Sequence, residues 1–379
     1  MNAEPNDDTE NQGPPDPRRN ARLVGQQAAE NVLAEGYQSG RLAHAWLLTG
    51  PKGIGKATLA YRFARFVLAG GGQAADEGPG LFGEEALPAA TPAGASPLEL
   101  APENPVFQRV AAAGHSDLMT VERGIGSTGK PRSEIVVGDV REVNRFLNLT
   151  AGEGGWRVVI IDSADEMNVN AANALLKVLE EPPPRALLLL VCHNPGRMLP
   201  TIRSRCRKLR LDDLTDETVA ELLADYCPEL DADARREVAA LADGSIGRAI
   251  DLAEADGWEL QRRIMQFLNA MPNPDFAELQ EFGAGMAKAD ALARFETLGE
   301  LLRRTLARLI RHAGGAGDAG NVQESEVFGR LAGASGLDRW LQVWEKTDDL
   351  LSRTGRINLD RKQVILNIFL EISQAARGA

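Results

Sequence analysis

The chain has 379 residues and a net charge of -12, which arises from 54 acidic and 42 basic residues. This balance argues against a dominant electrostatic grip on nucleic-acid phosphates, so any DNA contact has to be local or shared with partners. No apolar run reaches the length of a transmembrane helix, and the first twenty residues lack the apolar stretch of a signal peptide. A cytoplasmic protein of two or three domains is expected.

The N-terminal half alternates between short apolar runs and helical periodicity. Residues 1–20 can bury little apolar surface and are expected to be a disordered tail. Five apolar runs after them are typical of strands, at residues 44–50, 117–122, 157–162, 187–192 and 206–211. Helical patterns between these runs predict a parallel sheet with helices on both faces, so one α/β domain is expected over residues 21–211.

Two other kinds of segment complete the chain. Residues 70–116 interrupt the α/β pattern, are rich in Gly, Ala and Pro at their start, and are expected to form a flexible insertion. No strand pattern follows residue 211. Residues 212–256 suit a small helical domain, and residues 257–379 suit a second helical domain with long amphipathic segments such as 298–311.

The segment GPKGIGK, residues 50–56, lies between the first strand and the helix after it. Small residues allow backbone N–H groups to approach a phosphate closely, and the helix N-terminus adds partial positive charge. The residues of this segment and the helix after it that are predicted to bind nucleotide are Gly50, Gly53, Gly55, Lys56 and Thr58. Lys56 is expected to reach the β- and γ-phosphates. The alternative is a glycine-rich turn that binds no ligand.

The groups that would bind magnesium and hydrolyse ATP are incomplete. The full motif has Ser or Thr where this chain has Ala57, and Thr58 lies about 100° further around the helix. Asp162 ends a strand where a carboxylate can bind phosphate-bound Mg²⁺, with a turn or helix-cap role as the alternative. ATP-hydrolysing proteins of this pattern place Glu next, whereas Ser163 is no general base at neutral pH. We therefore expect ATP or ADP with Mg²⁺ as the cofactor, and weak hydrolysis or none.

NALLKVLEEPP (173–183) followed by LPTIRSRC (199–206) resembles the AAA+ clamp-loader subunits of bacterial DNA polymerase III. The resemblance covers residues 21 to about 255. It is closer to the delta prime branch, because tau/gamma subunits carry the residues that Ala57 and Ser163 replace. It implies an AAA+ P-loop domain with a five-stranded parallel sheet, a helical lid over 212–256 and an all-α collar over 257–379. It also implies that the chain helps to load a sliding clamp onto primed DNA.

The resemblance implies roles for three residues that spacing alone leaves open. Arg205 matches the Ser-Arg-Cys arginine, which acts in the family as an arginine finger on a neighbouring subunit's ATP; a surface arginine beside a strand is the alternative. Arg248 matches the second-sensor arginine of AAA+ lids, with a helix-surface arginine as the alternative. Asn194 matches the first sensor, although an Asn before a proline is also typical of a turn.

Metal ions and partners follow from the same resemblance. Many delta prime subunits carry a four-cysteine zinc module, but residues 70–116 contain no cysteine, so no zinc is predicted, and no metal site is predicted apart from Mg²⁺ that accompanies a nucleotide. The implied partners are the tau/gamma and delta subunits, with the clamp and primer-template DNA reached through the assembly, and no membrane. The alternative function is an ATP-hydrolysing motor subunit of the tau/gamma type. A group of arginines at 303, 304, 308 and 311 could contact phosphates, form an inter-subunit face or be solvated.

Overall fold

The computed structural model describes residues 16–71, 96–125, 132–149, 151–152, 155–315, 322–357 and 359–378. Most of the predicted tail, residues 1–15, lies outside these ranges, and so do residues 72–95 of the predicted insertion. The chain divides into two compact units, of which the first is residues 1–226 with 243–248 and the second is residues 227–242 with 249–379. The three-part division at residues 211 and 256 stays a prediction.

In the part that the structure describes, the first unit contains a sheet of five parallel strands in the order β2-β3-β4-β1-β5. The strands are β1 (Ala45–Thr49), β2 (Leu118–Val121), β3 (Arg157–Ile161), β4 (Ala186–Cys192) and β5 (Arg207–Arg210). Every residue of β3 and β4 is buried, as expected for inner strands of a parallel sheet. The predicted α/β class and its five strands are confirmed.

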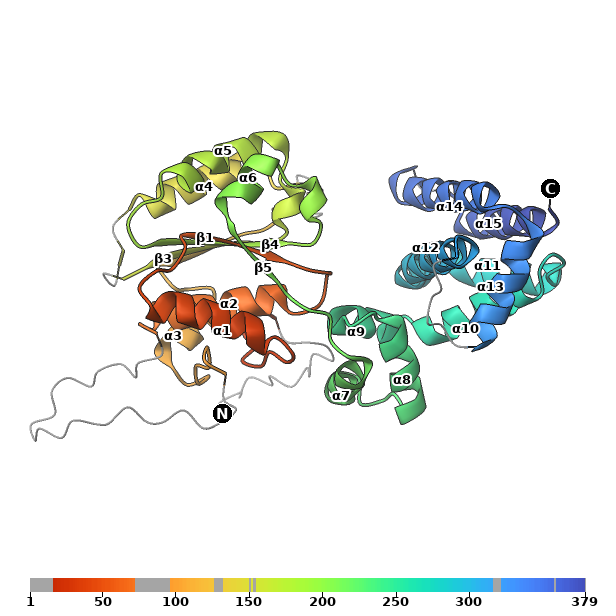
Figure 1. Ribbon diagram of the computed structural model, residues 1–379, viewed down its shortest axis with the longest axis horizontal. Coiled ribbons are helices and arrows are strands. Elements are labelled where there is room, and N and C mark those ends of the chain that lie inside the picture. Colours follow the sequence, from red (N-terminus) through yellow and green to blue (C-terminus); the bar gives the residue numbers. More distant parts are fainter. Residues whose placement is uncertain are drawn as a thin grey trace, which may run out of the picture. The chain divides into compact units, whose positions relative to one another are not determined.

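Helices cover both faces of this sheet (Figure 1). One face carries α1 (Gln27–Gln38), α2 (Lys56–Leu68) and α3 (Pro105–Ala111), and the other carries α4 (Val137–Leu147), α5 (Val169–Glu180) and α6 (Pro200–Arg205). Alternate residues of β1 serve the two faces, since Trp46 and Leu48 lie in one apolar core and Leu47 lies in the other. Residues 96–116 were part of the predicted insertion, but they are folded here and contain α3. Val110 of α3 is fully buried in the same apolar core as Trp46 and Leu48.

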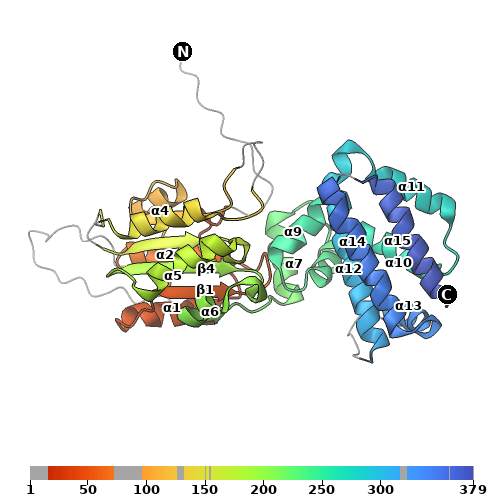
Figure 2. The same ribbon diagram turned by 90° about the horizontal axis from the view of Figure 1, so that it is seen from above.

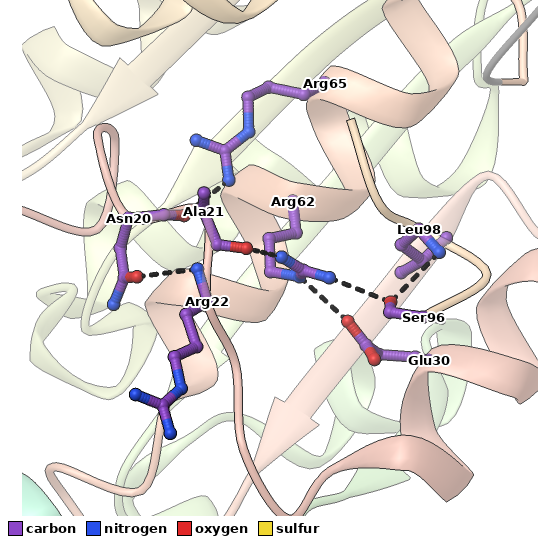
Figure 3. A network of polar contacts seen from close by, with 8 residues as sticks. All are labelled: Asn20, Ala21, Arg22, Glu30, Arg62, Arg65, Ser96 and Leu98. Atoms are coloured by element: carbon purple, nitrogen blue, oxygen red, sulfur yellow. Dashed lines mark hydrogen bonds and ion pairs between the residues drawn. The ribbon is translucent and has the colours of Figure 1, made fainter. Parts of the chain in front are cut away.

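Two buried arginines of α2 hold the segment that precedes α1 (Figure 3). Nε of Arg62 donates to Glu30 at 2.8 Å, and its other nitrogens donate to the hydroxyl of Ser96 and to a carbonyl of the segment 18–21. Arg65 donates to two further carbonyls of that segment, at 2.8 and 2.7 Å. Arg62 and Glu30 are only 4% and 0% exposed. The last residues of the predicted tail are therefore fixed against α2.

The first unit also contains α7 (Asp216–Tyr226) and the start of α9 (Ile246–Glu254). The second unit contains the rest of α9 and seven further α-helices in its described residues. These are α8 (Ala232–Leu241), α10 (Gly257–Asn269), α11 (Phe276–Met286), α12 (Leu292–Ala313), α13 (Val322–Ala334), α14 (Leu337–Ile357) and α15 (Arg361–Ala376). The long helices α12 and α14 lie side by side, as do α14 and α15 (Figure 2). Among the described helices, none is both long enough and apolar enough to cross a bilayer.

Three arginines of α12 are bonded within the second unit. Arg303 pairs with Asp348 at 2.7 Å, and Arg308 pairs with Glu324 at 2.6 Å. Arg304 donates to a backbone carbonyl at the end of α8. These partners favour an intramolecular role for the three arginines, because a guanidinium that is already paired has fewer donors left for a phosphate.

Candidate functional site

The loop between β1 and α2 contains three glycines with positive φ angles. Gly50, Gly53 and Gly55 have φ angles of 144°, 82° and 98°, a region that side chains disfavour. A Cβ atom on Gly53 would lie 2.5 Å from Oγ of Ser245 and 2.9 Å from Cα of Gly247. Glycine is therefore required at position 53 both by its backbone angle and by its close contact with the segment that contains Ser245 and Gly247.

The segment 243–248 packs directly on this loop. Oγ of Ser245 donates to the carbonyl of Lys52 at 2.7 Å, and the N–H of Gly247 donates to the carbonyl of Gly53 at 3.0 Å. These bonds place Arg248, the residue matched to the second sensor, next to the loop. Its side chain is 19% exposed, and its Nη1 lies 3.8 Å from Oδ2 of Asp243. Contact between the guanidinium of Arg248 and a bound phosphate stays a prediction.

Lys56 begins α2 and points back into the loop. Its Nζ donates to the carbonyl of Gly50 at 2.7 Å and also to the carbonyl of Pro51. The residue is only 3% exposed, and this burial lowers the pKa of Lys56 to about 8, although the nearby Asp162 and Asp165 act in the opposite direction. The lysine is thus held in a place where an anion would stabilise its charge.

We expect nucleotide affinity to depend on pH through Lys56. A bound phosphate favours the protonated lysine, so affinity should be level below pH 8 and fall above it, by up to about tenfold per pH unit. Isothermal titration with ADP from pH 6.5 to 9.5 measures this. Lys56→Arg should bind without the fall, because arginine stays charged, and Lys52→Ala serves as the control within the loop. A level profile for the unmodified chain would contradict the prediction.

Asp162 follows β3 beside Glu122, which follows β2. Its backbone N–H bonds the carbonyl of Val121 at 2.9 Å. Burial and then the charge of Glu122 raise the pKa of Asp162. A cation placed against this carboxylate would offset that cost. The predicted magnesium set stays incomplete, however, because Ala57 has no donor atom, and Thr58 is buried within α2 at 8% exposure.

The next residue, Ser163, has a φ of 59° and directs its hydroxyl at His193, with 3.2 Å between Oγ and Nε2. The neighbouring acids are engaged elsewhere. Asp165 accepts the backbone N–H groups of residues 193 and 194 at 2.9 and 3.0 Å. Glu166 pairs with Arg123 at 2.9 Å. Neither acid therefore replaces the glutamate that would orient the attacking water.

Two residues follow β4 at this edge of the sheet. Oδ1 of Asn194 accepts the backbone N–H of Gly196 at 3.1 Å and so caps the short helix 195–197. This is the turn that the sequence offered as the alternative to a sensor role. His193, which the sequence reasoning did not select, faces Ser163 instead. Burial, and then the charge of Lys56, lower the pKa of His193 to about 4, so its ring is neutral at pH 7. Its only sequence signal is its place directly after the fourth strand.

Arg205 lies at the opposite edge of the sheet. It ends α6 just before β5 begins. The first residue of β5 pairs with Trp46, near the beginning of β1, whereas the phosphate loop follows the end of β1. Its Nη2 lies 2.7 Å from Oε1 of Glu180, its Nη1 donates to the carbonyl of Thr201 at 3.1 Å, and its side chain is 36% exposed. Arg205 therefore lies near the amino ends of the strands, whereas this chain's own phosphate loop lies at their carboxyl ends.

The structure brings most of the predicted site residues together. The phosphate loop, Lys56, Asp162 and the start of α9 with Arg248 meet at the carboxyl edge of the sheet, as parallel strands allow. Asn194 lies at the same edge but bonds within its own turn. Arg205 is separate. In the residues that the structure describes, no group of three or more acids, histidines or cysteines could hold a metal ion.

Known proteins resemble this chain over different shares of its length. A family model described as DNA polymerase III, delta subunit, matches residues 99–215. The chain is 30% identical to DNA polymerase III subunit delta' of Escherichia coli over 346 residues, which are 90% of the chain and 92% of that protein. It is 39% identical to the corresponding subunit of Pseudomonas aeruginosa over 203 residues, 54% of the chain and 53% of that protein.

More distant similarity extends to other subunits of the same polymerase. The chain is 31% identical to the gamma/tau subunit of Mycobacterium tuberculosis over 211 residues, which are 55% of the chain and 31% of that protein. Among solved structures, a gamma subunit-related protein of Thermotoga maritima aligns with a TM-score of 0.36 and 18% identity, over 93% of this chain and 99% of that one. The sequence matches, rather than this alignment, carry the relationship.

Proposed function

This chain belongs to the delta prime subunits of DNA polymerase III, and from that premise we propose that it is a clamp-loader subunit that helps a neighbouring ATPase subunit to hydrolyse ATP. The observation that carries the proposal is the position of Arg205. Its side chain is 36% exposed, is bonded to its own chain, and lies at the other end of the strands from its own phosphate loop. A guanidinium presented in this way is suited to the charge that develops on a γ-phosphate in an adjacent subunit.

The phosphate loop is proposed to bind a nucleotide that this subunit does not turn over. The loop glycines and Lys56 fit phosphates, and Arg248 and Asp162 adjoin them. Bound nucleotide with Mg²⁺ would supply the cation that Asp162 is placed to meet. The chain's own residues offer no hydroxyl at position 57 and no general base at position 163, so hydrolysis should be slow even when the loop is filled.

The proposed partners are the tau/gamma and delta subunits, with the sliding clamp and primed DNA contacted through the assembly. The helical residues 257–379 are proposed as the collar that joins the subunits, and residues 212–256 as the lid. The motor alternative would need a base beside the γ-phosphate. Ser163 is bonded to a neutral histidine, and Asp165 and Glu166 are engaged with other groups, which argues against this alternative.

The purified chain should bind ADP and show no measurable ATP hydrolysis. Mixed with a partner ATPase subunit, a clamp-opening subunit, clamp and primed DNA, it should be required for rapid clamp loading. Phosphate release by the chain alone, and fluorescence-detected loading by the mixture, measure the two halves of this expectation. Robust hydrolysis by the isolated chain would favour the motor, and loading that proceeds equally well without the chain would reject the clamp-loader role.

A further inference from the structure

The guanidinium of Arg205 is held by Glu180, a residue outside the Ser-Arg-Cys segment. Oε1 of Glu180 lies 2.7 Å from Nη2 of the arginine, while the carbonyl of Thr201 accepts Nη1 at 3.1 Å. Glu180 is the last residue of α5 and Arg205 is the last residue of α6, and the two helices pack against each other. The guanidinium is thus held at two points, one on each helix.

The position of Glu180 is poor for the helix that carries it. An acidic side chain in the last turn meets the partial negative charge of the helix C-terminus, so local stability gives no reason for a glutamate there. The ion pair with Arg205 supplies a reason, since it places a positive charge at the ends of both helices. Both side chains remain partly in water, at 36% and 49% exposure, so the pair is accessible to a second molecule.

Resting on the proposed function, we infer that Glu180 is a positioning residue for the arginine finger. A free arginine side chain samples many rotamers, whereas a planar fork fixed through both terminal nitrogens is already oriented. The carboxylate holds the guanidinium in the direction in which it meets the neighbouring subunit's nucleotide. Glu180 itself touches neither nucleotide nor partner phosphate, and acts only through Arg205.

The test is a double-mutant cycle in the complete loader with clamp and primed DNA. Glu180→Ala should lower the ATP turnover number at the completed site by about fivefold, the effect of about 1 kcal/mol, with KM unchanged, because the lost orientation matters only in the transition state. Glu180→Gln, which keeps an oxygen acceptor, should fall in between. Glu181→Ala removes the same charge one residue later and should match the unmodified loader. In the Arg205→Ala background, Glu180→Ala should add nothing.

The outcomes separate this inference from the function beneath it. If Arg205→Ala has no effect on turnover, the arginine-finger role itself is rejected. If Arg205→Ala lowers turnover but Glu180→Ala does not, or raises it, Glu180 is not a positioning residue. An equal loss from Glu180→Ala in both backgrounds also rejects the inference, because the carboxylate would then act by another route. Unchanged unfolding temperature and ring assembly for both glutamate variants exclude a merely structural effect.

Discussion

A loader that contains Arg205→Ala is expected to hydrolyse ATP about 10³-fold more slowly at the site that this arginine completes. The reason is that the transferred phosphoryl group is stabilised in the transition state almost entirely by charge and position, and a truncated side chain leaves that charge unmet. Single-turnover hydrolysis in the loader with clamp and primed DNA measures the loss. In a loader with several ATP sites, the fraction of bound ATP at the affected site should be hydrolysed in a slow kinetic phase, while ATP at the other sites is hydrolysed at the normal rate.

Three variants make this result specific. Arg203→Ala removes a charge from the same short helix and should leave the fast phase intact. Arg205→Lys keeps the charge but loses the forked geometry, and should recover only part of the rate. Lys56→Ala should have a mild effect, because this chain's own loop is not the hydrolytic site. If Lys56→Ala stopped turnover while Arg205→Ala did nothing, the subunit would be a motor.

The strands and the phosphate loop could be predicted because their signals are local. A buried parallel strand is a short apolar run, and GPKGIGK carries its glycines within seven residues. All five predicted strands are confirmed by the structure. Helix α3 was missed because it is short and lies next to a segment rich in Gly and Pro, where its periodicity is weak.

The contacts that complete the site depend on the fold and could not be predicted from spacing. Arg205 meets Glu180 only because α5 and α6 pack side by side, and Gly53 meets Gly247 across almost two hundred residues of sequence. The engagement of Asp165 with the backbone after β4 is also a consequence of strand order. A pattern identifies which residues could act, and the topology decides which of them face each other.

The buried pair between Glu30 and Arg62 joins α1 to α2, and its loss should be the largest stability effect in the first unit. Glu30→Gln leaves the guanidinium charge buried without its carboxylate, at 4% exposure, which should cost about 3–5 kcal/mol. The unfolding transition of the first unit should then fall by about 10 °C. Calorimetry of the whole chain measures it, with Glu142→Gln as the control, because that glutamate pairs with Arg145 in water and should change stability by less than about 1 kcal/mol.

The same change should reach the phosphate loop. Arg62 and Arg65 together hold the segment 18–21. Two residues after this segment, Leu23 packs closely on the phosphate loop, where a Cβ atom on Gly55 would lie 2.6 Å from Cδ1 of Leu23. If the segment 18–21 is held less firmly, the contact between Leu23 and Gly55 holds the phosphate loop less firmly too. Glu30→Gln should therefore also weaken ADP binding, whereas Glu142→Gln should not. A Glu30→Gln chain that melts and binds ADP like the unmodified one would show that the pair neither stabilises this unit nor supports its loop.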